Sequence, residues 1–365
     1  MSTDRIKVLV LIKGLGLGGA EILVAEAAPL WDRSRFEYRV AYMLPWKDQL
    51  VAALHDAEVP VDALDWRRPP GLRAAVRLRR LARRWQPDIV HSHLPAAGLL
   101  ARLSLRDRTH VYTEHNLVTS YRPITRLLNR ATYARNRAVI AVSQAVADDI
   151  TGHSGPLVRV IPNGVSMASA LDGGARAELG LGSGDRLVVH VGNIRPHKGH
   201  ATLVAAARLL VNWHPNVTVV SVGGEKHAGD LKRMRKLAAD SGLGDHMRFL
   251  GRRSDARSFL AAADVVVNPA DVEGLPVSLL EALALARPVV ATAVGGVPTV
   301  IRHEVTGLLV RPGEPVELAS ALERALTAPD AAYWGQEGAR LVNRDFGLDR
   351  MVRQYESLYL ELVGA

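Results

Sequence analysis

The stretch RLVVHVGNIRPHKGHATLVAAARLLVNW, residues 186–213, contains the unit from which the fold can be predicted. Its first part, RLVVHVG (186–192), is a short apolar run rich in valine, which is typical of a strand buried on both faces. Residues 199–213 follow a helical pattern, and a turn separates them from the strand. A strand that leads through a turn into a helix predicts a parallel sheet with right-handed crossovers.

Similar apolar runs recur along the chain, and helical patterns such as residues 71–86 separate most of them. Strands are predicted before this unit at IKVLVLI (6–12), YRVAYML (38–44), DIVHSH (88–93), HVYTEH (110–115), AVIAVS (138–143) and VRVIPN (158–163). Strands are predicted after it at VTVVSVGG (217–224), MRFLG (247–251), DVVVNP (264–269), PVVATA (288–293) and GLLVRP (307–312). The predicted fold class is α/β, with two doubly wound Rossmann-like domains facing each other across a cleft.

The division between the domains is predicted within residues 164–184, which are rich in Gly, Ser and Ala. A chain of 365 residues is also too long for one ordinary core. We expect an N-terminal domain over residues 1–165, a C-terminal domain over residues 166–345 and a final helix within residues 346–365. Ligands of doubly wound sheets bind beyond the carboxyl ends of the strands, so the site is expected in the cleft between the domains.

Composition excludes several kinds of chemistry. The chain has no cysteine, which excludes a disulfide, a thiolate nucleophile and a cysteine metal site. The N-terminal apolar run of residues 6–12 is shorter than a signal-peptide core and far shorter than a membrane span. We therefore expect a soluble, cytoplasmic protein.

Positive charge is concentrated in the first half of the chain. The formal net charge is +9, and residues 1–165 carry all of it, with 24 Lys and Arg against 15 Asp and Glu. This asymmetry indicates an anionic partner for the first half. Nucleic acid is not expected, because no zinc-finger or ribonucleoprotein motif is present and aromatic residues make up only 5%.

The segment WRRPPGLRAAVRLRRLARRWQ (66–86) holds eight arginines and no acid. At helical spacing one face is apolar, and the opposite face carries Arg73, Arg77, Arg80 and Arg84; Arg122, Arg126 and Arg130 form a second set. These residues are either a solvated face of a helix packed on the sheet or a surface for anionic lipid. In the second case the protein is peripheral at the inner face of the membrane, with a lipid-linked sugar or another membrane-borne acceptor.

The loop KGLGLGGAE (13–21) follows the first predicted strand, and Gly14, Gly16 and Gly19 match the spacing G-x-G-x-x-G. A dinucleotide site also needs an acidic residue at the end of the second strand, and the sequence YMLP (42–45) supplies none. We prefer a loop whose backbone approaches a phosphate or a sugar. A plain turn comes second and a dinucleotide site third.

The segment EGLPVSLLEA (273–282) predicts a helix that begins at a proline, with Glu273 before it and Glu281 inside it. The first N–H groups of such a helix favour a diphosphate, and the two carboxylates can accept hydrogen bonds from sugar hydroxyls. Judged from this segment alone, the alternative is equally good: two ordinary acidic residues next to a helix end, with no ligand.

The turn VGNIRPHKGH (191–200) places Arg195 and Lys198 between a strand and a helix. Two cations there could neutralise a diphosphate leaving group without a metal. Solvated surface cations are the alternative.

Together these stretches resemble glycosyltransferase family 4, the retaining sugar-nucleotide transferases of GT-B fold. GGAE (18–21), HSH (91–93), TEHN (113–116), AVSQA (141–145) and PNGV (162–165) are similar to family elements, and EGLPVSLLEA is similar to its E-x7-E element. The resemblance covers nearly the whole chain. In one departure, Asn193 stands where the family often has the arginine of G-R-x-x-x-x-K-G, and Arg195 follows two residues later.

The resemblance implies the site residues. Glu281 would bind the ribose, and RFLGRR (248–253) would border the base. Arg195, Lys198, Ser278 at the helix end and Gly16 would hold the diphosphate. Glu273, Gly274 and Leu275 would hold the transferred sugar, with His115 near its anomeric carbon. Gly19, Glu21 and His93 are assigned to the acceptor side. We expect His91 and His93 to point to opposite faces of their strand, so that at most one enters the site.

The resemblance also implies a hexosyltransferase-type glycosyltransferase (EC 2.4) that acts on a nucleotide-diphosphate sugar and a glycan or lipid-linked acceptor, in cell-surface polysaccharide or glycolipid synthesis. No cofactor is expected and no metal, because Asp271 and Glu273 suit sugar binding better than metal binding. Retention is expected by same-face attack, with the leaving phosphate accepting the acceptor's proton. The alternatives are a sugar-nucleotide epimerase or a phosphorylase of the same fold, and a non-catalytic nucleotide-sugar-binding protein.

Overall fold

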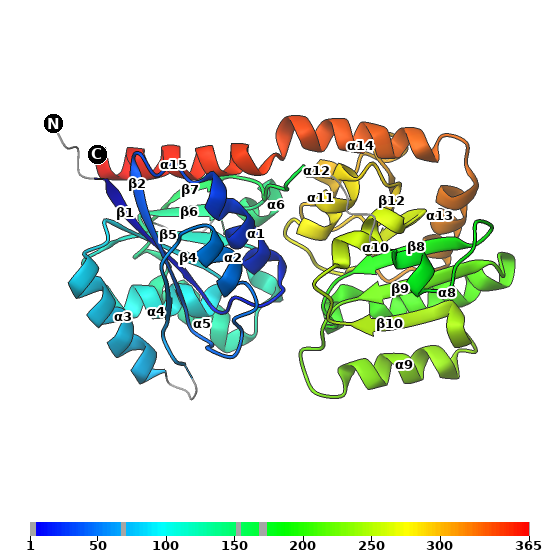
Figure 1. Ribbon diagram of the computed structural model, residues 1–365, viewed down its shortest axis with the longest axis horizontal. Helices are drawn as coiled ribbons and strands as arrows, with labels where there is room; N and C mark the ends of the chain where they lie inside the picture. The colour runs from blue at the N-terminus through cyan, green and yellow to red at the C-terminus, as the bar shows by residue number, and fades with distance from the viewer. Residues whose placement is uncertain (1–4, 67–70, 151–154, 168–173, 365) are drawn as a thin grey trace. The chain divides into compact units, whose positions relative to one another are not determined.

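A computed structural model describes residues 5–66, 71–150, 155–167 and 174–364 (Figure 1). The chain divides into two compact units. Unit 1 is Met1–Gly164 with Leu348–Ala365, and unit 2 is Val165–Gly347. Arg67 and Arg68 of the basic segment, and residues 168–173 of the predicted boundary, lie outside the described residues.

Unit 1 contains a parallel sheet of seven strands in the order β3-β2-β1-β4-β5-β6-β7. The change of direction beside β1 is typical of a doubly wound sheet. The strands are β1 (Ile6–Ile12), β2 (Phe36–Tyr42), β3 (Val61–Ala63), β4 (Ile89–His93), β5 (Thr109–Glu114), β6 (Ala138–Ala141) and β7 (Leu157–Val160).

Helices cover both faces of this sheet, because its central strands, such as β1 and β4, are buried on both sides. The helical elements are α1 (Gly19–Ala27), η1 (Ala28–Leu30), α2 (Val51–Asp56), α3 (Leu72–Trp85), α4 (Pro95–Ser104), η2 (Val118–Ser120), α5 (Pro123–Tyr133), α6 (Gln144–Ile150) and α15 (Leu348–Gly364). Leu9 and Leu11 of β1 belong to a core cluster with residues of α3 and α4. Figure 1 shows α3, α4 and α5 on the opposite side of the sheet from α15.

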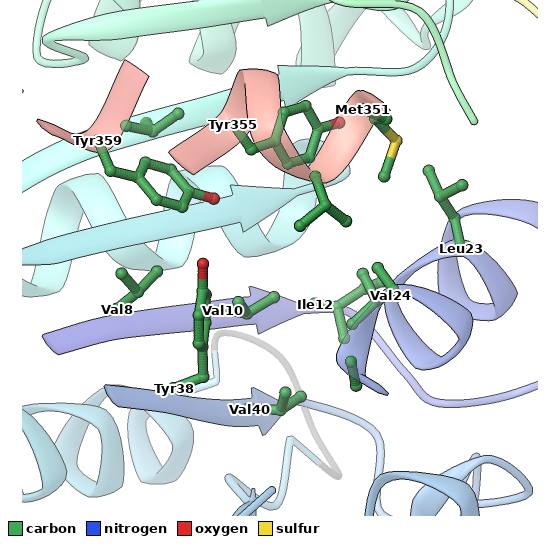
Figure 2. Close-up of a cluster of buried hydrophobic side chains, with 14 of the residues drawn as sticks. Val8, Val10, Ile12, Leu23, Val24, Tyr38, Val40, Met351, Tyr355 and Tyr359 are labelled. Atoms are coloured by element: carbon green, nitrogen blue, oxygen red, sulfur yellow. The ribbon is translucent and has the colours of Figure 1, made fainter. Parts of the chain in front are cut away.

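The other core cluster of unit 1 includes the C-terminal helix α15. Val8, Val10 and Ile12 of β1 belong to it, together with Leu23 and Val24 of α1. Met351, Tyr355 and Tyr359 of α15 complete this cluster, and Figure 2 shows them pointing toward the strands. Because residues two apart in a strand share a face, β1 serves the two clusters with alternate side chains.

Unit 2 contains a parallel sheet of six strands in the order β10-β9-β8-β11-β12-β13. The strands are β8 (Arg186–Val191), β9 (Val217–Val222), β10 (Met247–Gly251), β11 (Val265–Asn268), β12 (Val289–Thr292) and β13 (Leu308–Val310). The helical elements are α7 (Ala175–Glu178), η3 (Pro196–Lys198), α8 (His200–Trp213), α9 (Asp230–Asp240), η4 (Gly244–His246), α10 (Ala256–Ala262), α11 (Val277–Ala284), α12 (Val297–Val300), α13 (Pro315–Thr327) and α14 (Ala331–Asp345).

The predicted fold class is confirmed: the chain forms two Rossmann-like units with parallel sheets. The valine-rich strands of unit 2 build a core cluster with side chains such as Leu203 of α8 and Leu322 of α13. The cleft between the domains stays a prediction. Within the described ranges, no helix is both long enough and apolar enough to span a membrane.

Candidate active site

In unit 2, the loops after β8, β11 and β12 meet at the carboxyl ends of the strands. The N–H of Asp271 donates to the carbonyl of His197 at 2.9 Å, which joins the first two loops. The N–H of Gly296 donates to the carbonyl of Gly274 at 2.7 Å, which joins the last two. This edge of the sheet is where doubly wound folds bind their ligands.

Two glycines allow these loops to pack closely. Gly199 has φ +67° and Gly295 has φ +52°, in the left-handed region that side chains disfavour. A Cβ atom at Gly199 would overlap the carbonyl oxygen of Pro269, and one at Gly295 would overlap that of Glu273. The backbone around Lys198 and Glu273 therefore depends on glycine at both positions.

We predict that Gly295→Ala lowers the free energy of unfolding of unit 2 by about 2 kcal/mol or more, since it adds backbone strain and a clash. The measurement is denaturant unfolding. Gly313→Ala is the matched control, because Gly313 has φ +76° but no neighbouring atom within 4 Å of the new Cβ. Equal losses for the two variants would show that the close approach to Glu273 is unimportant.

Lys198 and Glu273 form an ion pair at the centre of these loops. Lys198 Nζ donates to Glu273 Oε1 at 2.5 Å, and Asn268 Nδ2 lies 3.5 Å from the same oxygen. Glu273 is buried, with 5% of its surface exposed. An ammonium group has three donors, so Lys198 can keep this contact and still donate to a ligand. The structure thus brings together two of the residues assigned to the donor.

Arg195 is placed differently from Lys198. Its side chain is exposed, and among the described residues it forms no hydrogen bond or ion pair. The pKa of His197 is sensitive to the positive charges of this loop. Burial lowers the pKa of His197, and the charges of Lys198 and Arg195 lower it further. A neutral His197 beside these cations is compatible with binding an anion here.

Helix α11 begins at Val277, directly after Pro276. Its first N–H groups have no acceptor within the helix, as at any helix start. The hydroxyl of Ser278 donates to the carbonyl of Val191 at 3.0 Å, which ties the start of α11 to the end of β8. Leu275 is buried, and Glu281 is partly buried on the second turn. Ser278 therefore positions the helix start through its side chain, a role that the sequence did not indicate.

The arginines of the RFLGRR segment have separate roles. Arg253 forms ion pairs with Glu178 at 2.8 Å and with Asp255 at 2.7 Å. The guanidinium group of Arg252 lies against Gly224, at the carboxyl end of β9. Arg252 is therefore the better candidate for contact with a base bound at this edge.

In unit 1, the first loop joins β1 to α1. Gly16 is buried, and its carbonyl accepts the N–H of Gly18 at 3.0 Å. Helix α1 begins at Gly19, and the carboxylate of Glu21 folds back against Gly18. A side chain at Gly18 would collide with that carboxylate. The loop is a glycine-rich strand-to-helix turn, and the approach of its backbone to a phosphate or a sugar stays a prediction.

Three histidines of unit 1 form a cluster at the carboxyl ends of β4 and β5. His93 Nδ1 and His115 Nε2 are 3.0 Å apart, so the two predicted histidines are hydrogen-bonded. The rings of His91 and His93 are 4.3 Å apart. The expectation that His91 and His93 point to opposite faces is wrong, because residues two apart in a strand share a face.

His91 connects this cluster to α15, which the sequence did not indicate. Its Nδ1 is 2.5 Å from the hydroxyl of Tyr359, and its Nε2 is 2.7 Å from the hydroxyl of Thr113. The C-terminal helix thus holds the strand end that carries His93. Chain positions so far apart share no sequence pattern that could have revealed this contact.

Burial keeps these histidines neutral. It lowers the pKa of His91 to about 3 and that of His115 to about 4. Burial also raises the pKa of the neighbouring Glu114 to about 7, while Tyr112 and Tyr121 donate hydrogen bonds to its carboxylate. A neutral His115 can accept or donate a hydrogen bond to a sugar hydroxyl but brings no positive charge.

We predict that the His115 ring stays neutral from pH 8 down to about pH 5. A group whose pKa is lowered takes up its proton only below the ordinary range, so no change is expected near pH 6.5. The measurement is the pH dependence of the ring's NMR signals, assigned with His115→Asn. A titration midpoint near 6.5 would contradict the partly buried, neutral state.

The arginines of α3 are all exposed, including Arg73, Arg77, Arg80 and Arg84, which were predicted to share one face. Arg77, Arg80 and Arg84 line a cavity of about 490 Å³ together with Arg39 of β2. Arg39 pairs with Asp62 at 2.9 Å, and Arg77 lies 3.8 Å from Asp65. These pairs leave the cavity with excess positive charge.

Among the described residues, no group of three or more His, Asp or Glu side chains has an arrangement that could hold a metal ion. Asp271 is exposed and Glu273 is buried, so these two acids have different surroundings.

Comparisons with known proteins match both units. A family model described as Glycosyltransferase Family 4 matches residues 17–169, and one described as Glycosyl transferases group 1 matches residues 174–340. A D-inositol 3-phosphate glycosyltransferase from Actinosynnema mirum is 31% identical, over 86% of this chain and 84% of its own length. One from Salinispora tropica is 29% identical, over 95% of this chain and 81% of its own length.

Solved structures are similar over nearly the whole chain. HepE from Anabaena, in a complex with UDP-glucose, is 25% identical with a TM-score of 0.83, over 97% of this chain and 99% of that chain. The sucrose-phosphate synthase of Thermosynechococcus elongatus is 22% identical with a TM-score of 0.85, over 98% of this chain and 99% of that chain.

Proposed function

Because the chain belongs to glycosyltransferase family 4, we propose that it transfers a sugar from a nucleotide-diphosphate sugar, with retention, to a glycan or lipid-linked acceptor. It is a hexosyltransferase-type glycosyltransferase of GT-B fold (EC 2.4). The observation that carries the proposal is the contact between Lys198 and Glu273 in loops at the carboxyl ends of β8 and β11. The UDP-glucose bound to the similar Anabaena protein supports the donor class.

Unit 2 would hold the donor's diphosphate. Lys198 and Arg195 come from one loop, and the start of α11 adds N–H groups that favour an anion. The positive groups would stabilise the charge that develops on the leaving diphosphate, in place of a metal ion. Gly16 of unit 1 is assigned to the same diphosphate through the family resemblance.

Glu273 would have two partners in the complex. Its buried carboxylate accepts from Lys198 and has remaining lone pairs for hydroxyls of the transferred sugar. The backbone of Gly274 and Leu275 follows directly and would add contacts to the same sugar. Glu281, one helical turn further along α11, would accept from the ribose hydroxyls.

His115 and His93 of unit 1 are assigned to the transferred sugar and the acceptor through the family resemblance. A neutral His115 near the anomeric carbon would hydrogen-bond a sugar hydroxyl, and His93 would hold its ring in place. Glu273 is engaged with Lys198, so we favour same-face attack over a carboxylate nucleophile. The leaving phosphate would accept the acceptor's proton as the new glycosidic bond forms.

The acceptor class follows from the charge of unit 1. An anionic or lipid-linked acceptor suits its basic surface, as in cell-surface polysaccharide or glycolipid synthesis. A phosphorylated inositol is the second acceptor to test, since the relatives' name specifies it. Gly19, Glu21 and His93 remain the acceptor-side residues of this proposal.

A thermal-shift screen against UDP-, GDP- and ADP-sugars tests the proposal first, followed by product analysis with acceptors present. We expect one nucleotide class to raise the melting temperature and a glycosylated product to form. Interconversion of the donor sugar without transfer would identify an epimerase. Binding without any turnover across the acceptor panel would favour a non-catalytic binding protein.

A further inference from the structure

Helix α5 of unit 1 buries polar side chains and exposes aliphatic ones, the reverse of an ordinary surface helix. Its buried residues include Asn129, 1% exposed, and Thr132, 7% exposed. Its exposed residues include Ile124 at 60%, Leu127 at 62% and Leu128 at 45%. A helix packed on a sheet normally turns its apolar stripe inward. This one turns polar side chains inward and aliphatic side chains outward.

The buried side of α5 is polar because it encloses a charge. Arg102 of α4 is 0% exposed, and its guanidinium donates to Asn129 Oδ1 at 2.7 Å and to Thr132 Oγ1 at 3.1 Å. Asn136 accepts a third hydrogen bond at 3.4 Å, and the Tyr112 ring lies 5.2 Å from the guanidinium carbon. A buried charge must be hydrogen-bonded, so this side of α5 cannot be apolar.

The aliphatic residues gather on the outer side of α5. Ile124, Leu127 and Leu128 are spaced i, i+3 and i+4, so they form one row. Arg122, Arg126 and Arg130 are also exposed, and the helix sequence PITRLLNRATY has no acidic residue. We call the three aliphatic and three arginine side chains the α5 outer face.

We propose that the α5 outer face docks on an anionic lipid bilayer, with the aliphatic row in the boundary between headgroups and acyl chains. The arginines would contact lipid phosphates. A helix with aliphatic residues flanked by cations is typical of interfacial membrane binding. Helix α4 packs against both α5 and α3, so the arginines of α3 belong to the same layer and add positive charge.

A protein partner fits this face less well. Three aliphatic side chains fall well short of the roughly 800 Å² per partner that stable protein interfaces bury. The flanking charges are all positive, so a second copy of the chain would meet like charges with like charges. A bilayer with anionic headgroups complements both the charge and the small apolar area.

Docking would place the acceptor side of unit 1 near the lipid surface. Strand β5 ends at Glu114, His115 follows it, and α5 begins at Pro123 after a short loop. The start of α5 therefore belongs to the same edge of the sheet as the histidine cluster. This consequence rests on the proposed transfer to a lipid-linked acceptor, whereas the docking itself does not.

Vesicle co-sedimentation tests the docking with the full chain. Wild type should bind phosphatidylglycerol vesicles, and the variant Ile124→Ser/Leu127→Ser/Leu128→Ser should bind them at least about tenfold more weakly. These residues are exposed, so the variant should fold, which circular dichroism checks. The matched control is Val305→Ser/Val316→Ser/Tyr333→Ser, which changes exposed apolar residues of unit 2 and should bind like wild type.

A second variant measures the contribution of the arginine charges separately from that of the aliphatic residues. Arg122→Gln/Arg126→Gln/Arg130→Gln should lose the preference for phosphatidylglycerol over phosphatidylcholine and most of the salt sensitivity. Unchanged vesicle binding by the serine variant would overturn the proposal. A dimeric wild type that becomes monomeric in the serine variant would also overturn it, in favour of a second copy.

The proposed function can fail independently of this inference. Donor-induced thermal shift and transfer to a water-soluble acceptor, both without vesicles, should be the same in wild type and the serine variant. Loss of vesicle binding with normal transfer would support both proposals. Vesicle binding by a wild type that neither binds a nucleotide sugar nor transfers one would support the docking alone.

Discussion

Replacing Lys198 with alanine is expected to lower kcat by roughly two to three orders of magnitude, the usual effect of removing one electrostatic donor to a developing charge. Lys198 Nζ is 2.5 Å from Glu273 Oε1, in the loop that precedes α8. The variant loses the cation nearest the proposed leaving diphosphate. It also leaves the buried carboxylate of Glu273 without its ion pair, so the sugar-binding loop loses its support.

Steady-state kinetics with saturating donor measures this effect. Lys236→Ala is a suitable control, because Lys236 pairs with Asp240 on the exposed side of α9 in the same unit. The control should turn over like wild type. Lys198→Ala with normal kcat would remove the leaving-group role, and an unfolded variant would be recognised by its circular dichroism spectrum.

Replacing Glu281 with alanine is expected to weaken donor binding by about 10- to 100-fold, as for the loss of hydrogen bonds to a charged group. Glu281 lies on the second turn of α11, whose start is tied to β8 through Ser278. Glu281 would contact the ribose equally in the bound donor and in the transition state of the transfer. The loss should therefore appear mainly in affinity, with a smaller change in kcat.

Titration calorimetry with the preferred nucleotide diphosphate measures this loss directly. Glu337→Ala is the control, since Glu337 pairs with Arg340 on the surface of α14. Donor affinity equal to wild type in Glu281→Ala would show that the ribose assignment is wrong. A fall in kcat with unchanged affinity would move Glu281 from binding to the chemical step.

The alternation of apolar runs and helical patterns was sufficient to predict both parallel sheets. Strands such as β1 and β6 are almost continuously apolar, and that pattern is specific for strands buried on both faces. Strand β3 (Val61–Ala63) was not predicted, because it is short and half polar. Its place at the edge of the sheet comes from pairing with β2, which no local pattern reveals.

The site was predicted less completely than the fold. Lys198 and Glu273 were each identified from local motifs, but their contact depends on the order of strands in the sheet. The links from His91 to Tyr359 and from Ser278 to Val191 also join distant parts of the chain. Sequence spacing cannot predict such contacts, because they exist only after the sheet has formed.

Helix α5 shows where periodicity misleads. The spacing of Ile124, Leu127 and Leu128 by itself predicts a buried apolar stripe. The structure exposes these residues because the opposite side must hydrogen-bond the buried Arg102. The need to satisfy one buried charge therefore decides which side of the helix faces the solvent.

We propose that this enzyme binds its donor's diphosphate through Lys198, Arg195 and the start of α11. A crystal structure tests this proposal most directly. The complex should contain the nucleotide diphosphate of highest affinity and be prepared with a metal chelator. We expect phosphate oxygens within about 3 Å of Lys198 Nζ and of the first N–H groups of α11. A diphosphate bound elsewhere, or one held through a metal ion with Lys198 turned away, would contradict the proposal.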